Sequence, residues 1–163
     1  MTKIGVLSDT HGYIDDPLLS FFDSCDQIWH AGDFGSMEVA DILAAKKPLT
    51  GVHGNIDDYF VRKKFPMHQR FICEEVDVWI THAGGYPGHY APPVYHEIHE
   101  HPPKLFICGH SHILKVMNDK KLGLLHINPG AAGISGQHLT RTAVRFVIDG
   151  DQIKDLEYIE LKK

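Results

Sequence analysis

The sequence predicts a mixed α/β (α+β) fold, and the order of its segments carries this prediction. Apolar, strand-like runs alternate with helical stretches in the first third of the chain. Short strand-like segments then follow one another, with few helical patterns between them. Because 163 residues without a repeat, linker or low-complexity stretch can bury one full core, we expect a single domain spanning residues 1–163.

The first third predicts the order β-α-β-α-β. Its strands are expected where short apolar runs are rich in branched residues, at residues 3–8, 27–30 and 49–52. One helix is expected over residues 16–25, with Pro17 in its first turn, and a second over residues 37–46, capped by Ser36 and ended by Pro48. This alternation predicts parallel strands joined by right-handed crossovers.

The remainder predicts mostly strands. A loop rich in Gly, Pro and Tyr is expected over residues 84–93, followed by a helix over residues 94–101. Turns are expected at residues 118–119 and 149–150. The strands are expected at residues 69–74, 77–81, 104–108, 113–117, 122–127, 142–148 and 152–159.

Composition limits the classes of function. No apolar run approaches the roughly 20 residues of a membrane helix, and no signal peptide precedes the first strand, so a cytoplasmic protein without membrane contact is expected. A net charge of −5 makes nucleic acid an unexpected partner. Cys25, Cys73 and Cys108 lack a pairing pattern and are expected to be reduced and buried. Thirteen scattered histidines are the unusual feature.

Polar residues follow five of the expected strands, where the core would gain nothing from them. Because binding sites in α/β sheets gather at the carboxyl ends of the strands, these residues are expected to converge on one crevice. Together they supply two carboxylates, four imidazoles and one amide. The candidate metal ligands are Asp9, His11, Asp33, Asn55, His82, His110 and His112.

Seven nitrogen and oxygen donors are too many for one tetrahedral zinc ion, and they suit two divalent metals that share a bridge. Asp33 is the natural bridge, while Asp9 and His11 face one side of an extended chain and could chelate one ion. His110 and His112 have the same spacing. A hydroxide held by both metals would be the nucleophile, with the metals stabilising the phosphoryl oxygens. Mixed His and carboxylate donors favour Mn, with Ni, Fe or Zn as alternatives, over Ca or Mg.

With these residues in place, the chain resembles the calcineurin-like metallophosphoesterase superfamily, and within it the small bacterial and archaeal phosphodiesterase branch. The resemblance spans almost the whole chain and implies a four-layer αββα sandwich with the metals at one edge. It also implies catalytic roles for Asn55 and His82. The matching motifs are Asp9-x-His11, Gly32-Asp33, Gly54-Asn55-x-Asp57, His82, Gly109-His110-x-His112 and Asn128-Pro129-Gly130.

The resemblance further implies how the ligands divide. Each metal would take four of the seven residues, because the bridge is counted twice. One metal would be bound by Asp9, His11, Asp33 and His112, and the other by Asp33, Asn55, His82 and His110.

One position departs from the pattern of many superfamily members. Ile56 stands where they carry a histidine that serves as general acid, so Asp57 has no such histidine to orient. This predicts a preference for leaving groups that need little protonation, such as aryl groups. His89 is the better candidate for a substitute acid or phosphate contact, with His53 as the alternative, although both are expected to be solvent-exposed.

The remaining polar residues have ordinary interpretations. Arg141 and Arg145 alternate along a late strand and are expected to be surface charges. No partner in the sequence supports a functional role for seven further histidines, which are His30, His68, His96, His99, His101, His126 and His138.

We therefore expect a metal-dependent phosphoesterase, most simply a phosphodiesterase, that acts on a small phosphate ester, with a homo-oligomer as one option for its assembly. The alternative is a catalytically weak protein-binding scaffold of the same fold, like a retromer subunit. That subunit has an incomplete ligand set, whereas all seven residues are present here. A nuclease is disfavoured by the acidic balance and the absence of a basic groove.

Overall fold

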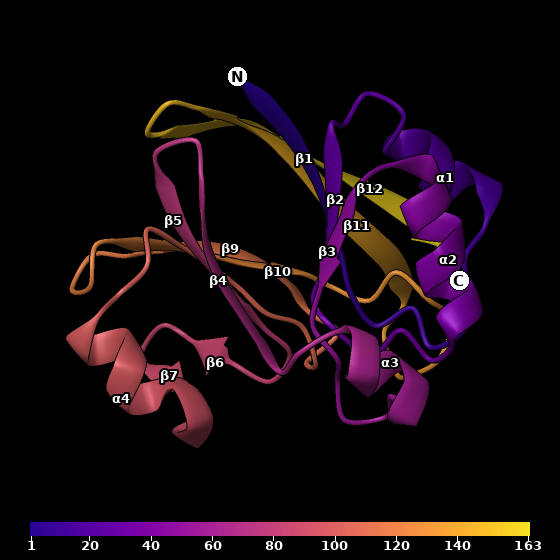
Figure 1. Cartoon of the computed structure of the whole chain (residues 1–163), viewed down its shortest axis with the longest axis horizontal. Helices are drawn as coiled ribbons and strands as arrows, with labels where there is room; N and C mark the ends of the chain where they lie inside the picture. Colours follow the sequence, from indigo (N-terminus) through magenta and orange to yellow (C-terminus); the bar gives the residue numbers. More distant parts are fainter.

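Two five-stranded sheets form the centre of the computed structural model, which describes residues 1–163 (Figure 1). The first sheet has the order β12-β11-β1-β2-β3, and the second has the order β4-β5-β8-β10-β9. The strands of the first sheet are β1 (Thr2–Leu7), β2 (Gln27–His30), β3 (Leu49–Gly51), β11 (Thr140–Asp149) and β12 (Gln152–Lys162). Those of the second are β4 (His68–Cys73), β5 (Val76–Thr81), β8 (Leu105–Ile107), β9 (Leu114–Asp119) and β10 (Leu124–Pro129).

Each sheet has three parallel strands next to antiparallel ones. In the first sheet, β1 pairs with β2 and β2 with β3 in parallel, as the sequence predicts, while β11 and β12 are antiparallel. In the second sheet, β5, β8 and β10 are parallel, while β4 and β9 pair antiparallel at the two edges. The carboxyl ends of the parallel strands therefore supply the loops from which a site can be built.

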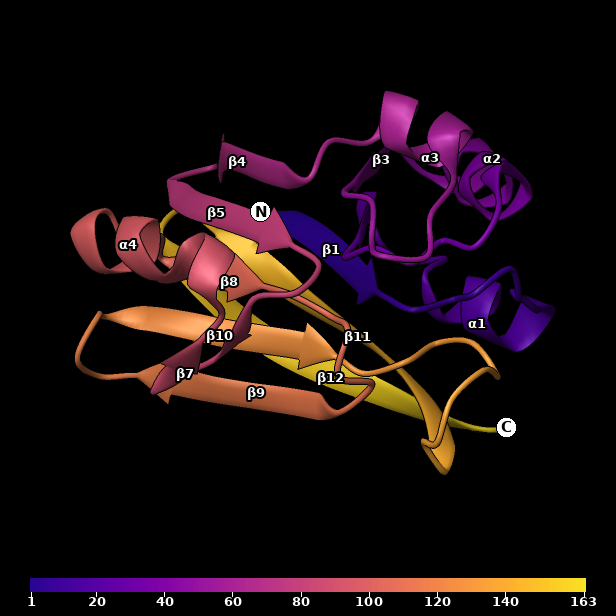
Figure 2. The same cartoon turned by 90° about the horizontal axis from the view of Figure 1, so that it is seen from below.

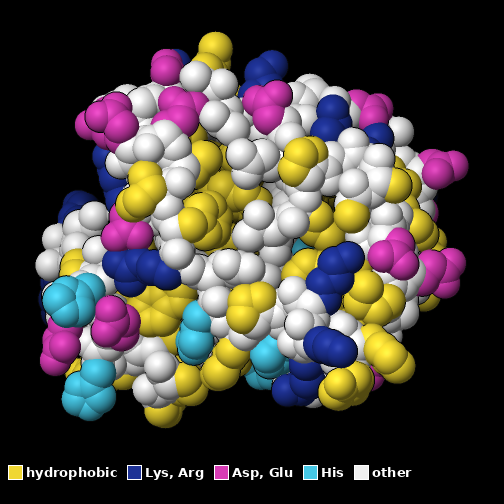
Figure 3. All heavy atoms as spheres, viewed as in Figure 1, with side chains coloured by type: hydrophobic (Ala, Val, Ile, Leu, Met, Phe, Trp, Pro, Cys, Tyr) yellow, Lys and Arg dark blue, Asp and Glu magenta, His cyan; other side chains and the backbone are white.

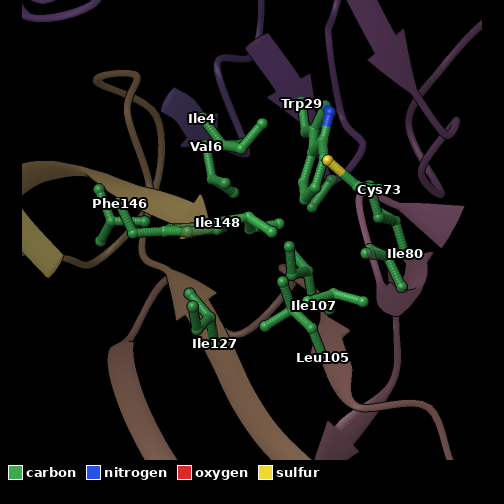
Figure 4. Packing of buried hydrophobic residues seen from close by; sticks show 14 of the residues in the cluster. Ile4, Val6, Trp29, Cys73, Ile80, Leu105, Ile107, Ile127, Phe146 and Ile148 are labelled. Carbon is green, nitrogen blue, oxygen red and sulfur yellow. The ribbon is translucent and has the colours of Figure 1, made fainter. Parts of the chain in front are cut away.

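The apolar side chains divide into layers that confirm the four-layer αββα expectation. One buried cluster lies between the two sheets and includes Trp29 and Phe146 from the first sheet with Ile107 from the second (Figure 4). The helices α1 (Asp16–Phe21), α2 (Met37–Lys46) and α3 (Tyr59–Lys64) cover the outer face of the first sheet, and α4 (Pro92–Glu100) covers the second (Figure 2).

Local chemistry explains where the helices begin and end. Ser36 Oγ accepts the Val39 amide and caps α2, as expected from the sequence. The first helix is shorter than predicted, because after Phe21 the chain continues in tight turns in which Cys25 N–H donates to Phe22 O. None of the four helices is long and apolar enough to cross a membrane.

Three local features differ from the sequence expectation. Helix α3 was not predicted, and Asp58 caps it by accepting the Val61 amide. The loop after β5 contains a short hairpin of β6 (Gly85–Tyr86) and β7 (His89–Tyr90). The turn expected at residues 118–119 starts later, because β9 continues to Asp119. The Asp119 Oδ1 atom accepts the amides of Lys121 and Leu122, which form the turn.

The expectation of a surface role for Arg141 is wrong. Its side chain is only 3% exposed and makes two hydrogen bonds to the Asp15 carboxylate, at 2.8 and 2.9 Å. Arg145 is partly exposed and pairs with Glu157 at 3.0 Å. An alternating pattern in β11 cannot reveal the first pair, because its partner lies 126 residues earlier in the chain. The three cysteines are free and buried, as expected.

Candidate metal centre

The loops that follow β1, β2, β5 and β8 are joined by backbone hydrogen bonds. Asp9 N–H donates to Gly32 O at 2.9 Å, and Gly109 N–H donates to His82 O at 2.9 Å. Each bond joins two polar strand ends of one sheet, and the His110 amide links the two sheets by donating to Asp9 Oδ2 at 3.1 Å. Figure 3 shows one face of the molecule. The histidine side chains visible there gather in the lower half of the view, where Figure 1 places α4, β6 and α3.

Asp9, His11 and His112 form one group, in which one ligand atom from each side chain lies within 4.8 Å of the others. The Nε2 atoms of His11 and His112 lie 3.7 and 3.3 Å from Asp9 Oδ1. Asp9 is fully buried, whereas both histidines are partly exposed. The group is therefore open on its histidine side.

Asp33, His82 and His110 form a second group of the same kind. His82 Nε2 lies 3.2 Å from Asp33 Oδ2. Asn55 Oδ1 completes the group, at 3.0 Å from His82 Nε2 and 3.1 Å from His110 Nδ1. His110 and His112 thus lie in different groups, despite being only two residues apart.

Asp33 lies between the groups. Its Oδ2 atom is 3.3 Å from His11 Nε2 in the first group and 3.2 Å from His82 Nε2 in the second. Its Oδ1 atom accepts the Ile56 amide at 3.1 Å, which fixes the carboxylate plane. The arrangement brings all seven expected residues to one crevice, with a carboxylate at its centre.

The backbone around the crevice is strained. Seven residues other than glycine have a positive φ, and five of them belong to the seven candidate ligands. Such conformations cost of order 1–3 kcal/mol each and gather at functional sites. The five candidates, with φ between 47° and 72°, are Asp9, His11, Asp33, His110 and His112.

Two motif glycines allow the strand ends to approach one another. A Cβ atom at Gly54 would lie 2.0 Å from Asp33 Oδ1, and one at Gly109 would lie 2.0 Å from Ser8 Oγ. Both contacts are far shorter than any real carbon contact. The glycines are therefore required by the packing of the centre itself.

A layer of buried polar residues holds the candidate ligands in place. Asp57 accepts the amides of Phe34, Gly35 and Gly54 at 2.8–3.2 Å, and thus ties the loop of Asp33 to the loop of Asn55. This is the role that the structure gives to Asp57 in the absence of a histidine at position 56.

Asn128 and His30 hold other parts of the crevice. Asn128 Nδ2 donates to Gly109 O and Ser111 Oγ at 3.0 Å and so braces the loop of His110. His30 is fully buried, accepts the Gly32 amide at Nδ1 and lies 3.0 Å from Thr10 Oγ1 through Nε2. Burial lowers the pKa of His30 to about 3, so this imidazole is neutral.

Electrostatics favour positive charge at the centre. Burial alone would raise the pKa values of Asp9 and Asp33, but attraction to the nearby histidines holds both below their usual range. The Asp9 carboxylate, 3.7 Å from His11 Nε2, raises the pKa of His11. The pKa of His82 is also raised, because the two carboxylates outweigh its burial.

The donor set fits divalent cations. Asp9 Oδ1 and His11 Nε2 are buried and have no hydrogen-bond partner. Leaving such groups unpaired costs about 1–3 kcal/mol each, and a cation between them would satisfy both. In addition, His82 Nδ1 lies 2.8 Å from Ala31 O, so that nitrogen carries the proton and Nε2 faces Asp33 with its lone pair.

Other expected residues lie around this centre. Ile56 is 46% exposed, and its side chain has no acid or base group to offer. His53 is half-buried rather than exposed, with Nδ1 2.8 Å from Phe65 O, and it lines a hollow of about 310 Å³ with Asn55. His89 is exposed on β7, as expected, and its ring lies 4.9 Å from that of Tyr86.

No sequence pattern points to one neighbour of the centre, His138. His138 Nε2 lies 2.8 Å from Gly133 O, and its ring lies 5.2 Å from the His112 ring. Both histidines line a hollow of about 410 Å³. A larger hollow, of about 580 Å³, lies elsewhere, beside Lys3 and Arg145.

The sequence matches the calcineurin-like phosphoesterase superfamily domain over residues 2–151, so the chain belongs to this family. No curated protein matches it significantly. Solved structures with the same fold include an archaeal phosphodiesterase, which is 20% identical with a TM-score of 0.73 and covers 98% of this chain and 99% of its own.

Two further structures are also similar in fold. A conserved uncharacterized protein of Streptococcus pneumoniae, a predicted phosphoesterase, is 21% identical, with a TM-score of 0.72 and coverage of 98% of this chain and 89% of its own. Vps29 of Entamoeba histolytica, complexed with Zn²⁺, is 15% identical, with a TM-score of 0.75 and coverage of 97% and 98%.

Proposed function

We propose that this chain is a metal-dependent phosphodiesterase that binds two divalent cations at the crevice. The observation that supports the proposal most directly is the pair of ligand groups with Asp33 between them. The buried and unpaired atoms Asp9 Oδ1 and His11 Nε2 support it independently.

The two groups support a division of the ligands between the cations. Asp33 belongs to both sets, because its Oδ2 atom is close to a histidine of each group. Mixed nitrogen and oxygen donors suit Mn²⁺, which we propose as the native ion, and also Ni, Fe or Zn. One cation would be held by Asp9, His11, His112 and Asp33, and the other by Asp33, Asn55, His82 and His110.

The bound cations would supply positive charge for the phosphoryl oxygens and lower the pKa of water to near neutrality. The residues of the chain bind and orient. Asp57 fixes Asn55 and Asp33 relative to each other, and Ala31 O fixes the His82 tautomer. Ile56 offers no proton, so the leaving group has to depart with little protonation unless His89 or His53 supplies the proton.

The three free, buried cysteines fit a reducing compartment, and we propose the cytoplasm.

A reconstitution experiment tests the proposal. The metal-free protein is loaded with Mn²⁺, Ni²⁺ or Zn²⁺, its metal content is measured, and it is assayed against aryl phosphate mono- and diesters. We expect two ions per chain and faster hydrolysis of diesters. Asp33→Asn should lose both ions and nearly all turnover, while His96→Ala, on the exposed face of α4, should change neither. Binding of fewer than two ions, or full turnover in Asp33→Asn, would refute the proposal.

The second candidate is a protein-binding scaffold, favoured by the similarity in fold to Vps29 of Entamoeba histolytica. The two candidates differ in what Asn55 does. If the protein is an enzyme, Asn55 is a metal ligand, and Asn55→Ala should abolish hydrolysis. In a scaffold, the wild-type protein hydrolyses no ester with any of the metals, and the same substitution leaves a partner complex intact.

A further inference from the structure

A pocket of about 470 Å³ opens beside the candidate centre, on the outer face of the second sheet. Gly109 and His110 line its near end, so it adjoins the His110 side of the second ligand group. Its other walls come from three separate segments, with Tyr86 from the β6–β7 hairpin, Lys115 from β9 and His126 from β10. The volume is typical of pockets that bind small molecules.

Tyr86 and Lys115 contact each other at the wall of this pocket. The ammonium group of Lys115 lies 4.4 Å from the centroid of the Tyr86 ring. Tyr86 is 42% exposed, and Lys115 is half-buried on a flexible side chain. The flat ring of a ligand could displace the Lys115 ammonium and stack on the Tyr86 ring. Lys115 would then donate a hydrogen bond to the edge of the ligand ring.

His126 lines the same pocket and carries a polar atom without a partner. Its side chain is 1% exposed, and Nδ1 is buried with no hydrogen-bond partner in the chain. Burial, followed by the nearby charge of Lys115, lowers the pKa of His126 to about 4, so its ring is neutral near pH 7. A neutral imidazole presents a donor or an acceptor at Nδ1 according to its tautomer, and it remains unpaired either way.

We propose that this pocket binds the flat heteroaromatic ring of a nucleotide-type phosphodiester, with the phosphate at the adjoining centre. The inference rests on the proposed function, because the pocket is assigned to the same site. A nucleobase edge carries both N–H donors and ring acceptors, which match His126 and Lys115. A simple phenyl ring would fill the space beside Tyr86 but offer no polar partner to Lys115 or His126.

Binding of nucleosides tests the pocket separately from catalysis. The protein is titrated with adenosine, guanosine, cytidine and uridine, and binding is followed by NMR shifts, with benzyl alcohol and ribose as comparison probes. None of these carries a phosphate, so binding does not depend on metals or turnover. We expect at least one nucleoside to bind more tightly than both comparison probes and to shift the signals of Tyr86, Lys115 and His126.

Three substitutions complete the test. Tyr86→Ala and Lys115→Gln should each weaken nucleoside binding by at least about fivefold, the lower end of the range for loss of a base-stacking contact. His126→Leu should weaken it similarly but leave thermal stability unchanged or higher, because it removes an unpaired buried nitrogen. Tyr95→Ala, an exposed tyrosine on α4, is the matched control and should bind like wild type.

The outcomes separate the two proposals. If no nucleoside binds better than benzyl alcohol, or if the three variants bind like wild type, the assignment of the pocket is overturned even in a protein that hydrolyses aryl diesters. If nucleosides bind as expected but no metal supports hydrolysis, the pocket stands as a nucleoside site and the catalytic proposal fails.

Discussion

Asp57 provides the sharpest test of how the centre is held together. This carboxylate is 4% exposed and accepts three amides, from Phe34, Gly35 and Gly54. Replacing it with alanine leaves two buried amides without a partner, while the partly buried Gly35 amide can turn to water. At about 1–3 kcal/mol for each of the two buried amides, we expect Asp57→Ala to lower the free energy of unfolding by about 2–6 kcal/mol.

The neighbouring Asp58 is the matched control, because it accepts only the Val61 amide at the start of α3. Asp58→Ala should cost about 1 kcal/mol, the usual value of a helix cap. Urea denaturation of both variants, with and without metal, separates stability from ligand positioning. Saturating metal should stabilise wild type and Asp58→Ala equally, because the cap does not touch the candidate ligands.

Asp57→Ala should also respond less to metal. Loss of a residue that orients metal ligands typically weakens affinity by 10–100-fold. A tenfold loss lowers the stabilisation by metal by about 1.4 kcal/mol at the same concentration. If both variants gain the same stabilisation from metal, the loop connection made by Asp57 does not position the ligands, and this reasoning is wrong.

Three further predictions follow from other parts of the structure. Gly54→Ala should bind metal weakly and lose most turnover, since its Cβ would collide with Asp33, and metal content after dialysis measures this. Arg141→Met should lower the free energy of unfolding by about 2–3 kcal/mol at pH 7, as it breaks a mostly buried pair with Asp15. Arg141 lowers the pKa of Asp15, so the pair stabilises the fold above about pH 4 and this contribution disappears as the pH falls toward the lower folded-state value. The difference between wild type and variant in urea should therefore shrink on acidification. Finally, hydrolysis rates across aryl and alkyl diesters should fall steeply with the pKa of the leaving group, and Ile56→His should flatten this dependence.

The sequence predicted most of the fold because its signals are local. The apolar runs of β1 and β2 and the Ser36 cap of α2 depend only on neighbouring residues. The β6–β7 hairpin was missed because each strand has only two residues, too few to show a pattern. The buried state of Arg141 depends on the distant Asp15, and no local pattern contains that information.

The same division between local and distant information explains the arrangement of His110 and His112. In an extended chain, residues two apart point to the same side, so the spacing alone allowed both histidines to serve one ion or two. Both residues have a positive φ, at 72° and 64°, which removes the alternation on which that argument depends. The loop instead directs His110 to the group of Asp33 and His112 to the group of Asp9. This backbone is set by contacts from elsewhere in the chain, because the His110 amide donates to Asp9 Oδ2 and Asn128 braces Gly109. The candidate ligands could therefore be found from their motifs, while their division between two groups depends on how distant strand ends pack against this loop.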